Sequence, residues 1–513
     1  MRHILLAFFS AILLVLCFPG FDVEYIAWFA LVPLLIAIRN KDLKSAFGLC
    51  FFTGIIFYIG VSYWLNETTG VTWIDFIIVG IFLISCYFGL FGLAFNFISK
   101  RTELPVFIVA PFIWVSIEYA RSHAGLLGFP WVIMGHSQYL NIPIIQISGF
   151  TGVYGISFLI VMVNVVISEV IHDRSIALKP IIVTVTVLVV SLVYGLSVVT
   201  KEPGGDTVNI SVIQGNIHQE IKWKRELLKQ HIEKHTQLTR EALENGKTSL
   251  IVWPETAVQG LIKHDNSLEQ TISTLAREIK THLLFGSSQQ PKYGTKEFRR
   301  KNTFNSAFMV SPEGEIMGQY NKINLLPFAE YLPYKDSFPW PSRIVSKAGN
   351  FTPGTEYTIF NLNGVNFAVL ICWETTSADL FRKFVKNGAA FTVNITNESW
   401  FGETDAPYHF AAMNVFRAVE NRVSLVRSAN TGISCFIDPY GRIMGRVRGH
   451  NNKDIFVEGY LTKEIPLSRE RTFYTNYGDV FAYMNLIVTA FMFALCFLKG
   501  KKYLAAKTER HSK

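Results

Sequence analysis

Residues 367–380 read FAVLICWETTSADL, and the end of this stretch indicates how the second half of the chain is built. The run from Phe367 to Ile371 is apolar and of strand length, which predicts a buried β-strand. Cys372 follows it directly, and Glu374 comes two residues later. A cysteine that closes an apolar strand is most often a small core residue, so this stretch by itself assigns Cys372 no chemical role.

Strand-like and helix-like segments alternate on both sides of this stretch. Strand-like runs lie at 208–217, 249–255, 282–288, 302–310, 367–373, 389–396, 423–429 and 434–439, and helix-like runs at 222–245 and 406–421. Strands and helices that alternate along a chain predict a layered α/β fold. Residues 203–475, which contain all of these segments, are numerous enough to bury one substantial core.

The remainder of the chain has the composition of a membrane protein. Of the 513 residues, 50% are hydrophobic and only 17% are charged, against roughly 25% charged in an ordinary soluble domain. Apolar blocks predict about eight membrane spans, seven in a membrane domain at 1–202 and one at 476–513 with a basic tail. The spans are expected at 4–18, 24–38, 45–64, 75–98, 105–120, 153–171, 180–199 and 481–498.

The first span has the basic start of a signal peptide. No small-residue cleavage site follows it, and another apolar segment comes at once, so we expect it to be retained as a span. Glu118 and His136 lie near the ends of predicted spans, where we expect them to reach the membrane interface.

Basic residues are concentrated in alternate loops between the predicted spans. The positive-inside rule then places both termini in the cytoplasm and residues 203–475 outside it. The net charge of +9 is explained by inner loops and a tail that face anionic lipid, so it requires no nucleic-acid partner. The residues on the cytoplasmic side are Arg2, Arg39, Lys41, Lys44, Lys100, Arg101, Arg174, Lys179 and the tail after 498.

Four of the six cysteines lie in or beside predicted spans, and only Cys372 and Cys435 lie in the exterior block. Two cysteines in an oxidising space leave a disulfide between them as an open alternative. The sequence contains no CxxC pair or Cys/His cluster that would indicate a metal site, and we expect no cofactor.

Three segments of the exterior block carry groups suited to acyl transfer. IVWPETAV (251–258) contains Glu255, YNKINLLPFAEYLP (320–333) contains Lys322, and LICWE (370–374) contains Cys372. A thiol needs a base to activate it, a carboxylate can accept its proton, and a cation can stabilise the oxyanion of a tetrahedral intermediate. The charged residues of these segments also have ordinary explanations: Glu255 as a turn or cap residue, Lys322 as a solvated loop charge and Glu374 as a first-turn acid.

The order WPE, YxKxxLxPFxE, CxE resembles the nitrilase or carbon–nitrogen hydrolase superfamily. Further segments resemble the apolipoprotein N-acyltransferases of bacterial envelopes, and together they run through nearly the whole chain. They are GFPWVIMGHSQ (128–138), TGVYGISF (151–158), QGNIHQEIKW (214–223), NESWFGETDAPYHF (397–410) and RSANTGIS (427–434). Two departures from the family pattern are Trp373, where Tyr is usual, and Ala329, where Gly is common.

The resemblance implies an α-β-β-α sandwich on a multi-pass helical membrane domain, in the bacterial inner membrane with the sandwich on the periplasmic side. It implies transfer of an acyl chain from a phospholipid, through an enzyme thioester, to the N-terminal amine of diacylglyceryl-cysteine on an apolipoprotein. The family triad would be Glu255, Lys322 and Cys372, supported by Glu330 and Glu374. Trp223, Trp400 and Phe401 are candidates for lining the acyl or lipoprotein site, with core packing as the alternative.

Two other functions stay open at this point. One is a membrane-anchored amidase or nitrilase that hydrolyses a small C–N bond. The other is a non-enzymatic lipid-binding or transport protein, although a transporter is expected to carry more ionisable groups within its spans.

Overall fold

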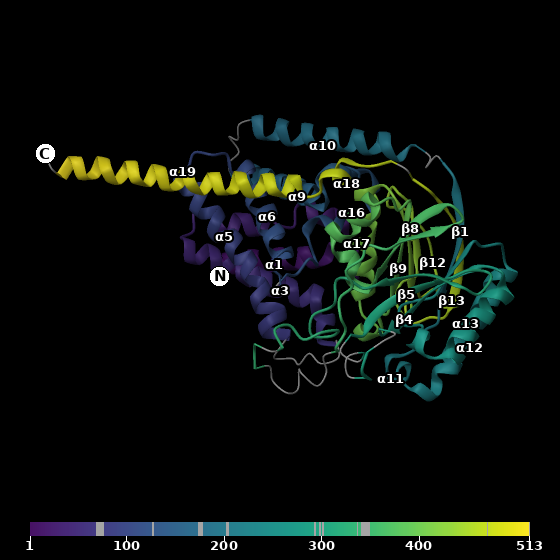
Figure 1. Ribbon diagram of the computed structural model, residues 1–513. Coiled ribbons are helices and arrows are strands. Elements are labelled where there is room, and N and C mark those ends of the chain that lie inside the picture. The colour runs from purple at the N-terminus through teal and green to yellow at the C-terminus, as the bar shows by residue number, and fades with distance from the viewer. Residues whose placement is uncertain are drawn as a thin grey trace. The chain divides into compact units, whose positions relative to one another are not determined.

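The computed structural model describes the chain except for residues 68–75, 126–127, 173–177, 202–204, 292–293, 297–298, 300–301, 336, 340–348, 469 and 512–513. The chain divides into two compact units (Figure 1). The helical unit contains most of residues 1–200 together with 477–513, and the sandwich unit contains residues 201–476. The boundary expected between 202 and 203 lies outside the described residues.

The helical unit consists of helices joined by short irregular segments. Within the described residues, five stretches are long and apolar enough to cross a membrane: Leu43–Glu67, Ile81–Arg101, Val153–His172, Leu178–Val199 and Val480–Lys499. The helices are α1 (Arg2–Leu16), α2 (Val32–Ile38), α3 (Leu43–Ser62), α5 (Ile84–Arg101), α6 (Val106–Ser122), α7 (Ile142–Ile145), α8 (Ser148–Thr151), α9 (Val153–His172), α10 (Leu178–Val199) and α19 (Val480–His511).

The span expected at 24–38 is not a single helix. A 3-10 turn at Glu24–Trp28 is followed by an irregular stretch and then by α2, which has only seven residues. Pro33 lies in the first turn of α2, a position that favours the start of a helix. Seven helical residues rise about 10 Å, far less than the roughly 30 Å of a hydrocarbon core.

Glu118 and His136 are buried inside the helical unit, so the expectation that they reach the membrane interface is wrong. Glu118 accepts a hydrogen bond from the backbone N–H of Met134 at 2.7 Å. Arg121, one turn later on α6, donates to the carbonyl of Trp131 at 2.9 Å. The residues near 131–134 are not in a continuous helix, and buried backbone groups of such a segment need partners inside the protein. These buried charges provide them.

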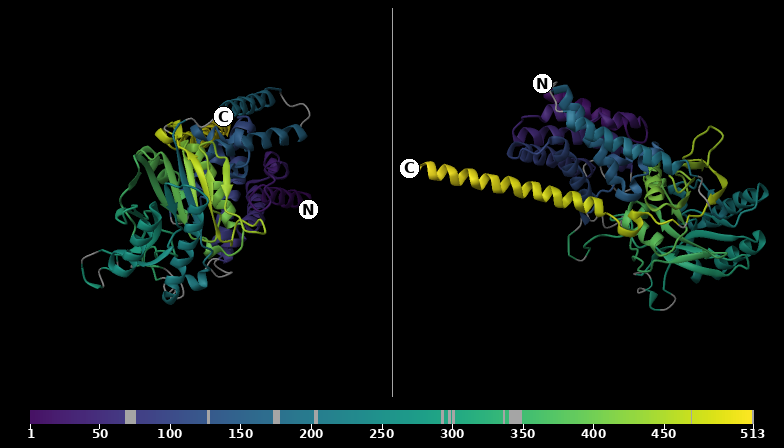
Figure 2. Two further views of the ribbon diagram at one scale, coloured as in Figure 1. Left: turned by 90° about the vertical axis from the view of Figure 1, so that its right-hand side faces the viewer. Right: turned by 90° about the horizontal axis from the view of Figure 1, so that it is seen from above.

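The sandwich unit contains two sheets (Figure 2). The first has the order β13-β1-β2-β4-β5-β6 with β3 beside β4, and the second has the order β12-β11-β10-β9-β8-β7. In each sheet three neighbouring strands are parallel, β1-β2-β4 and β9 between β8 and β10. The bounds are β1 (Thr207–Gln214), β2 (Leu250–Val252), β3 (Val258–Leu261), β4 (His282–Gln289), β5 (Phe304–Val310), β6 (Ile316–Asn321), β7 (Ile359–Leu362), β8 (Val365–Ile371), β9 (Phe391–Thr396), β10 (Ser424–Ala429), β11 (Cys435–Ile437), β12 (Ile443–Arg446) and β13 (Gly459–Pro466).

The two sheets face each other between two pairs of helices. The Ser428 hydroxyl on β10 donates to the carbonyls of Ile213 and Val252 at 3.2 and 3.1 Å, which joins the second sheet to the first. Helices α12 (Leu228–Glu244) and α13 (Asn266–Ile279) lie on one side of the strands, and α16 (Ala378–Lys386) and α17 (Ala406–Asn421) lie on the other (Figure 1). The architecture is therefore an α-β-β-α sandwich.

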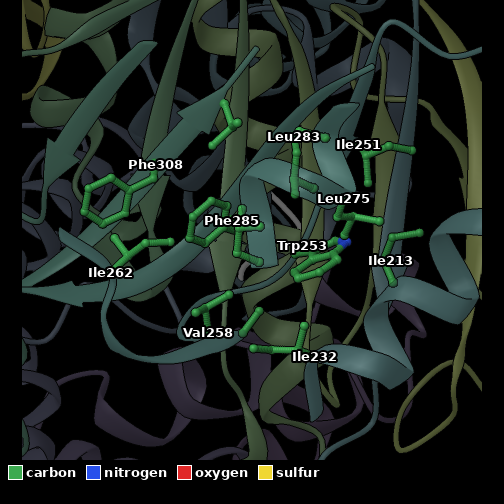
Figure 3. Packing of buried hydrophobic residues seen from close by; sticks show 14 of the residues in the cluster. Ile213, Ile232, Ile251, Trp253, Val258, Ile262, Leu275, Leu283, Phe285 and Phe308 are labelled. Carbon is green, nitrogen blue, oxygen red and sulfur yellow. The ribbon is translucent and has the colours of Figure 1, made fainter. Parts of the chain in front are cut away.

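A core cluster between the first sheet and helices α12 and α13 fixes the end of β2. Trp253, Phe285 and Phe308 are fully buried there and pack with Leu275 of α13 (Figure 3). The indole N–H of Trp253 donates to the Thr239 hydroxyl of α12 at 2.9 Å. The backbone after β2 is therefore anchored at Trp253, two residues before Glu255.

Candidate active site

Glu255 is held by two hydrogen bonds at the end of β2. Its Oε1 accepts from the Asn305 side-chain amide at 2.7 Å, and its Oε2 accepts from the backbone N–H of Asn397 at 2.8 Å. The residue is 7% exposed, and Thr256 after it has a φ of +48°. A residue with a side chain adopts this left-handed conformation only where its surroundings impose it. The backbone turn at Glu255 is therefore strained and firmly held.

Lys322, the first residue after β6, is almost completely buried. Its ammonium lies 2.8 Å from Glu330 Oε2 and 3.8 Å from Glu255 Oε1, and its side chain is only 1% exposed. Burial lowers the pKa of Lys322, but Glu330 and the other neighbouring acidic groups raise it more, so the net pKa lies above its usual range. Lys322 is a buried cation, and its interpretation as a solvated loop charge is wrong.

Glu330 and Glu255 share one partner that sequence reasoning missed. The Asn305 amide donates to both carboxylates, at 2.8 Å to Glu330 and 2.7 Å to Glu255. Glu330 also accepts from the backbone N–H of Leu326 at 2.7 Å, which closes the loop after Lys322. The signal for Asn305 in the sequence is weak, because Asn305 and Ser306 are two polar residues in a strand that is otherwise apolar.

The Ala329 departure from the family pattern causes no backbone strain. The positive φ in this loop, +67°, belongs to Phe328 and not to Ala329. Replacing a glycine by alanine at position 329 therefore requires no left-handed conformation from the alanine.

Cys372 occupies a sharp turn between β8 and a 3-10 helix at Cys372–Thr376. Its φ is +56°, a left-handed conformation that side-chain-bearing residues rarely adopt. The Asn394 amide on β9 donates to the carbonyls of Leu370 and Cys372 at 3.0 and 3.1 Å, so hydrogen bonds on both sides hold the turn. Strain of this kind concentrates at functional sites, and it separates Cys372 from an ordinary core cysteine.

Glu374 connects the cysteine turn to the lysine loop. It accepts hydrogen bonds from the backbone N–H groups of Ile371 (2.7 Å), Ile323 (2.8 Å) and Asn324 (2.9 Å) and from the Tyr320 hydroxyl (2.8 Å). Burial raises the pKa of Glu374 to about 7, against the effect of these donors and of Lys322. One carboxyl group thus sets the relative positions of the strand end before Cys372 and the residues after Lys322.

The Cys372 thiol is neutral at pH 7. Burial, followed by the field of Glu255, raises its pKa to about 12, although Lys322 acts in the opposite direction. All six cysteines, each of which lies in the described part of the chain, are free thiols, so the Cys372–Cys435 disulfide is absent. A thiol with so high a pKa must transfer its proton to a nearby base as it reacts.

A second buried charge network lies behind the cysteine turn and was also missed. Arg427 on β10 is fully buried, donates to Asn394 and Glu398, and donates through Nε to the carbonyl of Ile433 at 3.0 Å. Arg427 is the first residue of the motif RSANTGIS. It contacts Asn394, which donates to the Cys372 carbonyl, so the motif supports the cysteine turn indirectly. A single arginine inside the apolar run VSLVRSA was the available signal.

The aromatic candidates differ in exposure. Trp223 is 50% exposed directly after the short helix α11 (Gln219–Lys222), and Trp400 is half-buried. Phe401 is 8% exposed and packs against Phe410 with ring centroids 5.6 Å apart. Within the described residues, no group of three or more His, Cys, Asp and Glu side chains is arranged to hold a metal ion.

The sandwich, with a cysteine at a strand end beside buried acidic and basic groups, defines a domain of the carbon–nitrogen hydrolase class. The family model for carbon–nitrogen hydrolases matches residues 209–473. An amidase from Nesterenkonia sp. has a TM-score of 0.38, at 16% identity over 55% of this chain and 94% of that chain.

Both units also match one particular family. The model for the apolipoprotein N-acyltransferase N-terminal domain matches residues 10–166. An apolipoprotein N-acyltransferase from Geobacter metallireducens is 37% identical, covering 97% of this chain and 95% of that protein. One from Pasteurella multocida is 28% identical, covering 93% of this chain and 92% of that protein. The chain belongs to the apolipoprotein N-acyltransferase family.

Proposed function

We propose that this protein transfers a fatty acyl chain from a membrane phospholipid to the N-terminal amine of diacylglyceryl-cysteine on an apolipoprotein, through a thioester on Cys372. The observation that carries the proposal is the arrangement of Cys372, Lys322 and Glu255. A strained turn presents a neutral thiol within the electrostatic field of a buried ammonium and a buried carboxylate.

In the first half of the reaction, Glu255 accepts the proton of the Cys372 thiol while the sulfur attacks the ester carbonyl of the phospholipid. Negative charge develops on the carbonyl oxygen, and the Lys322 ammonium stabilises it. The C–O bond of the ester then breaks, and Glu255 returns the proton to the departing lysophospholipid oxygen. The acyl group remains on Cys372 as a thioester.

In the second half, the free α-amine of the apolipoprotein attacks the thioester carbonyl. Glu255 removes a proton from the amine nitrogen and passes it to the leaving sulfur, so the thiol is regenerated. The net change replaces one ester bond by one amide bond. Lysophospholipid leaves before the acceptor binds, which gives a ping-pong course.

The remaining site residues have supporting roles in this proposal. Glu330 is the counter-ion that keeps Lys322 protonated, and Glu374 holds the cysteine turn and the lysine loop in register. Trp223, Trp400 and Phe401 line the acyl or lipoprotein site. The large exposed surface of Trp223 supports such a role for that residue.

We further propose a membrane domain at 1–202, a catalytic domain at 203–475 on the periplasmic side, and a last span with a cytoplasmic tail at 476–513. The five long apolar stretches support a multi-pass membrane domain, and the distribution of basic loops supports both termini in the cytoplasm. Both substrates are lipid-anchored, so an enzyme held in the same bilayer meets them at high effective concentration.

The experiment uses the purified full-length protein in two steps. Phospholipid with a labelled acyl chain is added alone, and the label should appear on Cys372 in a form that hydroxylamine releases. A diacylated lipopeptide is then added, and its mass should increase by one acyl group while the protein loses its label. Release of ammonia from small amides without acylation of the lipopeptide would instead identify a hydrolase. A requirement for both substrates before any acyl group moves would exclude the thioester route.

A further inference from the structure

Lys222 is a fully buried lysine beside the candidate base. It is the last residue of α11, and its ammonium donates a hydrogen bond to the backbone carbonyl of Glu255 at 3.2 Å. Lys224, two residues later, is exposed, so its charge stays in water whereas the charge of Lys222 does not. Burial of the Lys222 charge removes its hydration and is unfavourable for folding unless a nearby group compensates.

The charged and titratable groups around Lys222 identify the compensating group. Burial lowers the pKa of Lys222 to about 8, and Glu255 is the neighbour that raises it. His235 of α12 also faces this region, but burial lowers its pKa to about 3, so it is neutral at pH 7. Glu255 therefore supplies both the hydrogen-bond acceptor and the opposing charge for Lys222.

The other end of α11 reaches the Glu255 carboxylate by a second route. The side-chain oxygen of Gln219 accepts from the Ser399 hydroxyl at 2.9 Å and from the Asn397 amide at 3.3 Å. The backbone N–H of Asn397 in turn donates to Glu255 Oε2 at 2.8 Å. The short helix thus holds the backbone of Glu255 at one end and its carboxylate, through Asn397, at the other.

Taking Glu255 as the base of the proposed function, we propose that Lys222 is a positioning residue for this base. Its ammonium holds the Glu255 carbonyl in the strained turn before Thr256 and opposes the charge of the Glu255 carboxylate. Trp223, which is exposed, directly follows Lys222 in the chain.

The test measures acylation of Cys372 by p-nitrophenyl acetate in the full-length protein, with Cys372→Ala as the background. The variants are Lys222→Met, which removes the donor and the charge, and Lys222→Arg, which keeps both. Lys224→Met is the matched control. We expect Lys222→Met to lower the acylation rate constant at saturating ester on the order of 10- to 100-fold, with an unchanged KM. Lys222→Arg should recover most of the rate, and Lys224→Met should leave it unchanged.

The pH profile separates positioning from packing. As the pH rises through about 8, Lys222 loses its proton, its bond to the carbonyl weakens and its charge disappears. The acylation rate of the unmodified protein should therefore have a component that falls in this window. That component should be absent from Lys222→Met and from Lys222→Arg, because methionine does not titrate and arginine stays protonated.

Two outcomes would overturn the inference. One is equal acylation by Lys222→Met and Lys224→Met. The other is equal loss in Lys222→Arg and Lys222→Met when melting temperatures show that the arginine variant is folded. If Lys222→Met does not fold, Lys222→Arg alone provides the test. A retained acylation rate without the alkaline fall supports the inference, and a retained alkaline fall overturns it.

p-Nitrophenyl acetate acylates Cys372 without either lipid substrate. A failure of the Lys222 proposal can therefore be distinguished from a failure of the proposed function. If the variants behave as expected but phospholipid never acylates Cys372, the proposed function is wrong and the role of Lys222 stands. If phospholipid acylates Cys372 equally fast in Lys222→Met and Lys224→Met, the role of Lys222 is wrong and the function stands.

Discussion

The Lys322 ammonium lies 2.8 Å from the Glu330 carboxylate, a full 1.0 Å closer than the 3.8 Å that separates it from Glu255. Glu330 is therefore the nearer of the two ion-pair partners of Lys322. Burial, followed by the field of Glu255, raises the pKa of the Cys372 thiol, so this thiol is protonated at rest.

Replacement of Lys322 by methionine should remove the fixed positive charge that stabilises the oxyanion in the proposed mechanism. We expect the rate constant for acylation of Cys372 to fall on the order of 10²–10³-fold, as on loss of one oxyanion donor. The rate is measured in a single turnover with a labelled phospholipid. Lys453→Met is the control, because Lys453 forms a surface pair with Glu403 in which both side chains are more than half exposed. A Lys322→Met variant with near-normal turnover would exclude this role.

Glu330→Gln should leave the buried Lys322 charge with Glu255 as its nearest partner. Removal of one member of a buried ion pair typically costs about 3–5 kcal/mol of stability. Activity should fall as well, because a carboxylate paired with Lys322 is a weaker base. Thermal unfolding and single-turnover acylation measure the two effects. Unchanged melting together with unchanged acylation would show that Glu330 is not the counter-ion.

The two cysteines of the sandwich unit should respond differently to substitution by serine. Cys372→Ser replaces the nucleophile by a hydroxyl that is far less reactive at neutral pH, so little turnover should remain. Cys435 is a buried free thiol on β11, and Cys435→Ser should retain activity with some loss of stability. Mass analysis without reductant should find both thiols unpaired in active enzyme. Inactivity of a folded Cys435→Ser variant would contradict this assignment.

Arg427→Met should destabilise the sandwich unit strongly. The change leaves the buried Glu398 carboxylate without its ion-pair partner and removes the hydrogen bond that fixes Asn394. A loss of about 3–5 kcal/mol is expected, seen as a large fall in melting temperature. Arg240→Met is the control, because the Arg240–Glu278 pair is about half exposed, and it should change the melting temperature little. Equal melting temperatures for the two variants would contradict the prediction.

Membrane orientation can be tested with a reporter that functions only outside the cytoplasm. Inserted after Gly246, in the loop between α12 and β2, it should be active. Fused to the C-terminus, it should be inactive. The reverse pattern would overturn the periplasmic placement of the sandwich unit.

The layered fold was readable from local patterns. All eight expected strand-like runs contain strands, and the helix expected at 406–421 agrees with α17 to the residue. The strands that escaped prediction include β6 and β12, which are largely half-buried and end their sheets. A strand at a sheet edge has one partner and a mixed surface, so its alternation of apolar and polar residues is weak.

The helical unit was predicted less well, because apolar content alone does not distinguish a long helix from a buried irregular segment. The stretch at 24–38 is apolar enough for a span but is interrupted before α2. Glu118 and Arg121 are buried where they form hydrogen bonds with backbone groups of Met134 and Trp131. These contacts depend on tertiary packing.

The sequence by itself determined the kinds of chemical groups available and the strands and loops that carry them: Glu255 after a strand, Lys322 in a loop and Cys372 at a strand end. Only the tertiary structure decided which groups act on one another. Asn397 holds Glu255 across 142 residues of sequence, and Lys222 holds it across 33. Protonation depends on distance and burial in three dimensions, and contacts between such remote residues leave no local pattern in the chain.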